Sequence, residues 1–128
     1  MEYIIWFIII LALFLLFIFR NKKKKLTSSQ KKEIITFFNK IKKSRSNNEK
    51  IIDFDKLYHR ILKDLWYKWS FGEILKKEPK EILNLNKIWE LHKLRNNLVH
   101  QFNWEKEDFL EKKSKEYIKE IQKILKNI

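Results

Sequence analysis

The chain has 128 residues, with one Gly, one Pro and no Cys, and a formal net charge of +13 at pH 7. The scarcity of turn-forming residues argues against an all-β fold and favours long helices, and the absence of Cys excludes disulfides and thiolate metal sites. Twelve of the 29 Lys and Arg residues fall between positions 20 and 50, where only two acidic residues balance them. This charge lies beside an apolar N-terminal segment, which points first to a membrane surface and only second to nucleic acid.

Residues 3–19 form an unbroken run of 17 apolar side chains. As a helix this run is about 26 Å long, close to the hydrocarbon thickness of a bilayer. We therefore expect residues 1–20 to be a single transmembrane anchor. A cleaved signal peptide is the alternative, although no basic residue precedes the run and Ala12 is the only Ala in the chain, so no small-residue cleavage site is evident.

A basic juxtamembrane linker, residues 21–26, follows the apolar run directly. Positive charge flanking a membrane span favours the cytoplasmic side, so we expect a single-pass protein of the plasma (inner) membrane with its C-terminal domain in the cytoplasm. Nuclear targeting and RNA binding are other uses of such a run. At a membrane, the run is expected to contact anionic lipid through Arg20, Lys22, Lys23, Lys24 and Lys25.

The remaining residues, 27–128, are predicted to be one all-α domain. Apolar residues spaced at three and four positions predict four long helices and one short one, at 27–45, 51–70, 71–77, 85–101 and 104–128. Capping boxes are expected at Thr27 with Gln30 and at Ser70 with Glu73, and Asn103 is expected to cap the last helix. Helices of this length joined by short connections fit a four- to five-helix antiparallel bundle.

The apolar faces of these helices define the expected core. Its members are Ile34, Ile35, Phe37, Phe38, Ile41, Leu57, Tyr58, Ile61, Leu62, Leu65, Trp69, Ile88, Leu91, Leu94, Leu98, Phe109, Leu110, Tyr117, Ile118, Ile121, Leu125 and Ile128. Gly72 is expected to allow close packing near Trp66 and Trp69. Asp53 and Asp55 are expected to stabilise the positive end of their helix, and His59 is interpreted as a surface or structurally satisfied histidine.

Residues 91–100, with the sequence LHKLRNNLVH, concentrate Arg, Asn and His within a few helical turns. His92, Asn96 and His100 recur every four residues and should form one polar line on the helix. The spacing Arg95-x4-His100, with Asn96 directly after the Arg, resembles the signature of the HEPN superfamily. Segments 51–58, 70–75 and 85–100 also resemble short bacterial HEPN-like proteins that carry an N-terminal membrane anchor, so the resemblance covers roughly residues 27–128.

HEPN domains are small helical bundles, and many of them are ribonucleases that need no metal ion. The resemblance implies that His100 is the acid or base, that Arg95 clamps the phosphate and that Asn96 orients His100 or the RNA backbone, with His92 and Lys93 as substrate-binding candidates. It also implies a homodimer through the helix that carries Arg95 and His100. An imidazole suits proton transfer near neutral pH, and a guanidinium suits a phosphorane-like charge. No metal or cofactor is expected.

Other interpretations of the same residues stay open. The polar cluster can be purely structural, because Arg and His near a helix C-terminus satisfy free carbonyls, or it can bind RNA or phosphate without catalysis. The domain can also be a non-catalytic, membrane-tethered module that binds an unknown protein through a surface such as that around Trp89. A shared metal ion at His92 and His100 is not expected, because the two lie about 12 Å apart along the helix.

Overall fold

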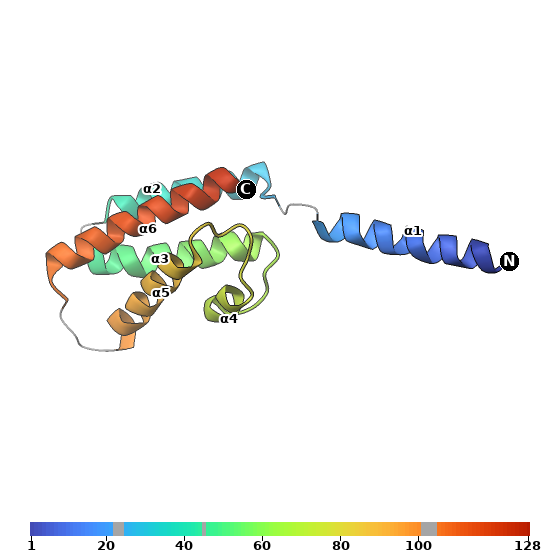
Figure 1. The fold of residues 1–128 in the computed structure, drawn as a ribbon. Coiled ribbons are helices and arrows are strands. Elements are labelled where there is room, and N and C mark those ends of the chain that lie inside the picture. Colours follow the sequence, from blue (N-terminus) through green and yellow to red (C-terminus); the bar gives the residue numbers. More distant parts are fainter. Residues whose placement is uncertain (22–24, 45, 101–104) are drawn as a thin grey trace.

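A computed structural model describes residues 1–21, 25–44, 46–100 and 105–128. Within these ranges the chain is all-helical, with no strand, as predicted. Figure 1 shows the six helices, α1 (Glu2–Asn21), α2 (Ser28–Lys42), α3 (Asn47–Asp64), α4 (Phe71–Lys76), α5 (Leu85–His100) and α6 (Glu107–Asn127).

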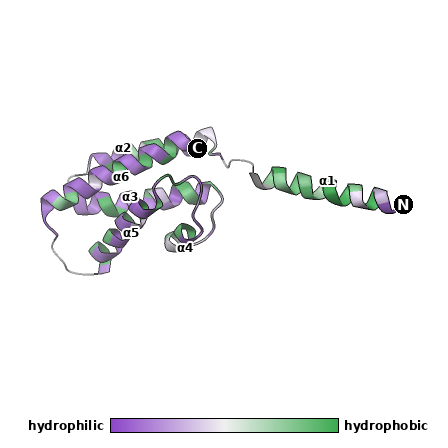
Figure 2. Ribbon diagram, viewed as in Figure 1, coloured by the Kyte–Doolittle hydropathy of each residue, from purple (hydrophilic) through white to green (hydrophobic). Residues whose placement is uncertain are grey.

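Helix α1 lies apart from the other five helices (Figure 1) and is apolar along nearly its whole length (Figure 2). No part of its apolar window, Glu2–Phe19, is buried. Among the described residues it is the one helix long and apolar enough to cross a membrane, and a signal sequence near the N-terminus has the same properties. Of the basic residues expected to contact lipid, Lys25 is exposed, whereas Lys22, Lys23, Lys24 and the side chain of Arg20 lie outside what the structure describes.

Local capping explains where α2 and α3 begin. The Thr27–Gln30 capping box is confirmed, because the Gln30 N–H donates to Thr27 Oγ1 at 3.2 Å and the Thr27 N–H donates to Gln30 Oε1 at 2.9 Å. Helix α3 begins at Asn47, earlier than predicted, since the Ser46 hydroxyl accepts from the Glu49 N–H at 3.3 Å. Arg45, the predicted end of the first domain helix, lies outside the described residues, and α2 itself ends at Lys42.

The predicted extension of α3 to residue 70 is wrong, because a C-terminal cap stops the helix at Asp64. Trp66 adopts the left-handed conformation, with φ of 76°. The Trp66 N–H donates to the Lys63 carbonyl at 2.9 Å and the Tyr67 N–H to the Leu62 carbonyl at 3.1 Å, which is the Schellman pattern. As a result Trp69 leaves the core face and is 46% exposed, with Lys77 Nζ 3.2 Å from its ring centroid.

Helix α4 packs against α5 after a short turn. The Glu73 carboxylate accepts from the Ser70 N–H at 3.1 Å, as the predicted capping pair requires, and it also accepts from the Ser70 hydroxyl at 2.7 Å. Gly72 packs near α5, where an added Cβ would lie 3.9 Å from His92 Nε2 and from Trp89 Cη2. The expectation that Gly72 packs near Trp66 and Trp69 is therefore wrong.

Helix α3 is the central element of the domain and packs against α2, α5 and α6. Its core face is apolar except for one carboxylate, that of Asp55. The core extends beyond the predicted set through Ile51, Phe54, Phe71, Ile74, Leu75, Ile82 and Ile124. Ile35, Phe37 and Phe109 are instead 42%, 47% and 38% exposed. The apolar stripes of α2 and α6 are wider than the part of each helix that packs against its neighbours, so these residues at the stripe edges stay in contact with solvent. The predicted start of the last helix at residue 104 is wrong, because α6 begins at Glu107 with Lys106 as its N-cap. Asn103 and Trp104 themselves lie outside the described residues.

Candidate functional site

A buried carboxylate on α3 joins α3, α5 and α6. The side chain of Asp55 is only 5% exposed. Asp55 Oδ1 accepts from the Tyr117 hydroxyl of α6 at 2.5 Å and from His92 Nδ1 of α5 at 2.9 Å. Arg95 Nε lies 3.6 Å from Asp55 Oδ2, so this contact is an ion pair and not a hydrogen bond. We call Asp55, His92, Arg95, Asn96 and Tyr117 the Asp55 network.

Tyr117 is fully buried and acts only as a donor. Burial, and after it the adjacent Asp55 carboxylate, raise the pKa of the Tyr117 hydroxyl well above its ordinary value. The hydroxyl therefore keeps its proton across the physiological range and donates it to the carboxylate. Since an unpaired buried carboxylate is costly, these partners explain how Asp55 is accommodated on a core face.

Asn96 connects the histidine and the arginine of the network. Arg95 Nη1 donates to Asn96 Oδ1 at 2.9 Å, and Asn96 Nδ2 lies 3.4 Å from His92 Nε2. When the His92 Nδ1–H is directed at Asp55 and Nε2 carries no proton, Nε2 is the acceptor for the Asn96 amide. The His92 ring also meets the Phe71 ring edge-on, with centroids 4.7 Å apart. The predicted polar line thus holds between His92 and Asn96.

The polar line does not extend to His100. His100 is the last residue of α5 and is exposed, and in the described part of the chain no hydrogen bond or ion pair joins it to the Asp55 network. Because α5 is helical from Leu85 to His100, Arg95 and His100 lie about 140° apart around its axis. The two side chains therefore leave α5 in different directions. Lys93, the other substrate-binding candidate, is exposed.

A second charged cluster, which is partly buried, joins α5 to α6. Lys113 Nζ donates to Glu90 and, at 3.0 Å, to Glu116, while Lys87 Nζ donates to Glu90 at 2.6 Å. The hydrogen bonds from Lys113 and then Lys87 lower the pKa of the Glu90 carboxyl below its ordinary value. All four charges have partners within the cluster, so its role is to fasten α5 against α6.

The sequence analysis missed Asp55 as a site residue. The prediction placed it at the N-terminal end of a helix, but α3 begins at Asn47, so Asp55 lies more than two turns inside it. A signal was present, because Asp55 falls on the same stripe as Ile51, Tyr58 and Leu62, all of which are buried. An acidic residue on an apolar stripe requires donors from neighbouring elements, and His92 and Arg95 are two of the polar residues that could supply them.

Comparisons with protein-family models, with curated proteins and with solved structures gave no match. The HEPN relationship is therefore a prediction from the residues quoted above. In the described residues, no three His, Asp or Glu side chains gather closely enough to hold a metal ion.

Proposed function

We propose that residues 27–128 form a HEPN-like domain that binds RNA and cleaves it without a metal ion, and that α1 holds this domain at a membrane. The observation that supports this proposal most directly is the contrast between Arg95 and His100 on one helix. The guanidinium of Arg95 is fixed by Asp55 and Asn96 and remains 25% exposed. His100 stands at the exposed end of the same helix, open to solvent.

Arg95 and His100 are the residue types required for RNA cleavage in which the 2′-hydroxyl of the RNA is the nucleophile. The 2′-oxygen attacks phosphorus, the bond to the 5′-oxygen breaks, and the products are a 2′,3′-cyclic phosphate and a 5′-hydroxyl. A histidine, with a reference pKa of about 6.5, can take the proton from the 2′-hydroxyl or give one to the leaving oxygen. A guanidinium in fixed orientation stabilises the charge that gathers on the phosphoryl oxygens.

Two copies of the chain are needed to complete the proposed site, because Arg95 and His100 diverge on one helix. In a symmetric dimer, the same surface of each copy faces the other, so Arg95 of one copy can act with His100 of the second. The last turn of α5 offers an exposed apolar contact for this pairing, since Val99 is 47% exposed. The proposed dimer therefore pairs the two copies along α5.

The direct test is RNA cleavage by the full chain in the presence of a metal chelator. We expect Arg95→Ala and His100→Ala each to lower the cleavage rate by about 100-fold or more. His59→Gln is the matched control, because His59 Nε2 contacts the Trp69 carbonyl at 3.0 Å and its ring stacks on Phe71, so the change removes none of the hydrogen bonds of the Asp55 network. The proposal is wrong if both site variants cut at the rate of the parent chain.

A mixing experiment tests the shared site. Equal amounts of the Arg95→Ala and His100→Ala chains, allowed to exchange partners, form mixed dimers in about half of all pairs. Each mixed dimer retains one complete site when the two residues come from different copies, so about a quarter of the parent activity returns. No recovery after exchange would place both residues of each site in one chain and exclude the shared arrangement.

A second candidate function is a membrane-tethered module that binds another protein without catalysis. Trp89 favours it, because its half-buried side chain lines a cavity of about 500 Å³ together with Asn86, Glu90 and Lys93. Trp side chains in such positions often dominate protein interfaces. This function predicts that neither the parent chain nor any of these variants cleaves RNA. It also predicts that Trp89→Ala, but not His100→Ala, releases the partner protein that the module holds at the membrane.

A further inference from the structure

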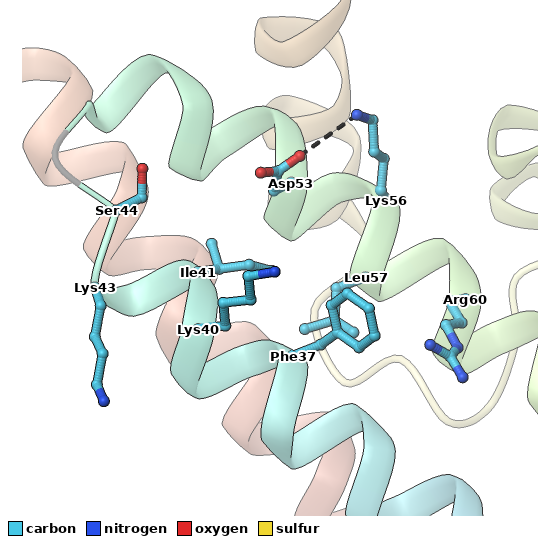
Figure 3. Close-up of a pocket in the computed structure, with 9 residues that line it drawn as sticks. All are labelled: Phe37, Lys40, Ile41, Lys43, Ser44, Asp53, Lys56, Leu57 and Arg60. Atoms are coloured by element: carbon cyan, nitrogen blue, oxygen red, sulfur yellow. Dashed lines mark hydrogen bonds and ion pairs between the residues drawn. The ribbon is translucent and has the colours of Figure 1, made fainter.

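A groove between α2 and α3 combines an apolar floor with a cationic rim, as Figure 3 shows. Its volume is about 510 Å³, within the range typical of small-molecule sites. Phe37, Ile41 and Leu57 supply the apolar lining. Ile41 and Leu57 are buried beneath it, whereas the Phe37 side chain is 47% exposed. We call this feature the α2–α3 groove.

Four cations stand around the groove against one carboxylate, that of Asp53. Two of the cations already have partners. Lys56 Nζ lies 3.4 Å from Asp53, and Arg60 Nη2 lies 2.5 Å from Glu33. No hydrogen bond or ion pair joins the side-chain ammonium group of Lys40 or Lys43 to any other residue that the structure describes. The rim therefore keeps an excess of positive charge beside an apolar floor, which suits a ligand with an acidic head and an apolar body.

We propose that the α2–α3 groove holds an acyl chain of an anionic phospholipid, with the phosphate of the headgroup at Lys40 and Lys43. This inference rests on the proposed attachment of α1 to a membrane. The lipid would come from that membrane and would seat the helical domain against its surface. The apolar lining takes the chain, and the unpaired lysines take the charge, as expected for basic surfaces at anionic bilayers.

The distances along the chain permit this seating. Six residues separate Asn21 from Ser28, and they span at most about 20 Å. Phe37 lies nine residues into α2, which is about 14 Å along the helix. The groove is thus within reach of the bilayer surface in which α1 would end.

Other occupants fit the groove less well. A second copy of the chain carries a net charge of +13, so the cationic rim opposes self-association there. RNA would satisfy the lysines, but its phosphates offer nothing to the aliphatic side chains of Ile41 and Leu57. An acidic amphipathic segment of another protein is the remaining alternative, and the experiment below separates it from lipid.

The absence of Cys from the chain allows a single probe to be placed at the groove. Ser44 lines the groove, so the full chain with Ser44→Cys carries a bimane fluorophore there, and Lys119→Cys on α6 carries it at a control position. Each protein is reconstituted in vesicles of phosphatidylcholine with phosphatidylglycerol, and only the acyl chains of the phosphatidylglycerol are brominated. We expect the Ser44 probe to be quenched about threefold more than the Lys119 probe.

Charge reversal at the rim supplies the matched comparison. The double variant Lys40→Glu with Lys43→Glu should abolish the extra quenching at Ser44. The double variant Lys112→Glu with Lys115→Glu on α6 changes the net charge by the same amount and should leave the extra quenching intact. Equal quenching at both probes, or quenching that survives the rim reversal, overturns the inference. So does a Ser44 probe that brominated lipid leaves unquenched but an acidic peptide carrying a quencher quenches, because the groove would then belong to a protein segment.

Flotation of the same vesicles separates this inference from the proposed attachment. If the chain floats with pure phosphatidylcholine vesicles and the Ser44 probe is not quenched in anionic ones, attachment through α1 holds and the groove inference fails. If the chain does not float with vesicles of either composition, the attachment itself is wrong, and the groove inference fails with it.

Discussion

The first three turns of α5 and its last turn carry similar polar residues in opposite surroundings. His92 has a side chain only 13% exposed and is held by Asp55 from α3 and by Asn96 from its own helix. His100, eight residues later, is exposed and has no bond to that network in the described part of the chain. A proton moved from His92 would disturb a buried carboxylate, whereas a proton moved from His100 would not. The comparison shows that burial, and not residue type, separates the structural histidine from the candidate catalytic one.

The largest expected loss of stability comes from removing the Asp55 carboxylate, which holds the buried polar side chains of the Asp55 network. Asp55→Ala leaves the Tyr117 hydroxyl and the Arg95 guanidinium without their partner, so we expect the free energy of unfolding to fall by about 3–5 kcal/mol. Asp53→Ala is the matched control, because the Asp53 carboxylate is 49% exposed and, among the residues that the structure describes, pairs only with Lys56. It should cost less than about 1 kcal/mol. Urea unfolding of the full chain in micelles, followed by Trp fluorescence, measures both. Equal losses would contradict the role given to Asp55.

A smaller effect is expected when each histidine is removed in turn. His92→Ala deletes a hydrogen bond to a charged group and the ring contact with Phe71, and it should cost about 2–3 kcal/mol. His100→Ala should change the free energy of unfolding by less than about 0.5 kcal/mol. The same unfolding measurement applies. A large loss at His100 would show that the last turn of α5 is also part of the packed structure.

A smaller loss than that of His92→Ala is expected for Tyr117→Phe, and this loss depends on pH. Loss of the hydrogen bond to Asp55 should cost about 1.5 kcal/mol at pH 7. Because the pKa of Tyr117 is higher in the folded chain than its ordinary value of 10.0, its stabilisation is complete below pH 10 and is lost as the pH rises above that value. We expect the variant to lose stability less steeply between pH 10 and 12, by about 1.4 kcal/mol per pH unit. Parallel curves for the two proteins would contradict this account.

Much of the fold could be predicted because its signals are local. The capping pairs Thr27–Gln30 and Ser70–Glu73 lie three residues apart, and the bonds between them form as expected. The end of α3 could not be predicted in this way. Its cap places Trp66 in a left-handed conformation that usually selects Gly, and the apolar pattern continues past it to Trp69. An apolar period alone gives no sign that the backbone has turned.

The residues of the candidate site also differ in whether the sequence alone could identify them. His92, Arg95 and Asn96 could be selected from the sequence because they gather on one helix. Asp55 could be recognised as buried from its apolar stripe, but its pairing with Tyr117 could not be predicted, because it depends on how α3 and α6 pack beside α5. The helical repeat alone predicts that Arg95 and His100 point in different directions around α5. This prediction applies because α5 is one continuous helix from Leu85 to His100.

The Asp55 network also determines how α5 is aligned along α3. The apolar ridge Ile88, Leu91 and Leu94 is nearly regular, so a shift of α5 by one turn, about 5.4 Å, would bury a similar amount of apolar surface. Only one of these offsets brings His92 and Arg95 to the Asp55 carboxylate. The other offsets leave a charge buried without partners, much as a misplaced polar residue does in a coiled coil. The Asp55 carboxylate thus selects one register of α5 among several that apolar packing alone would allow. That register fixes the position of His100 at the end of the helix.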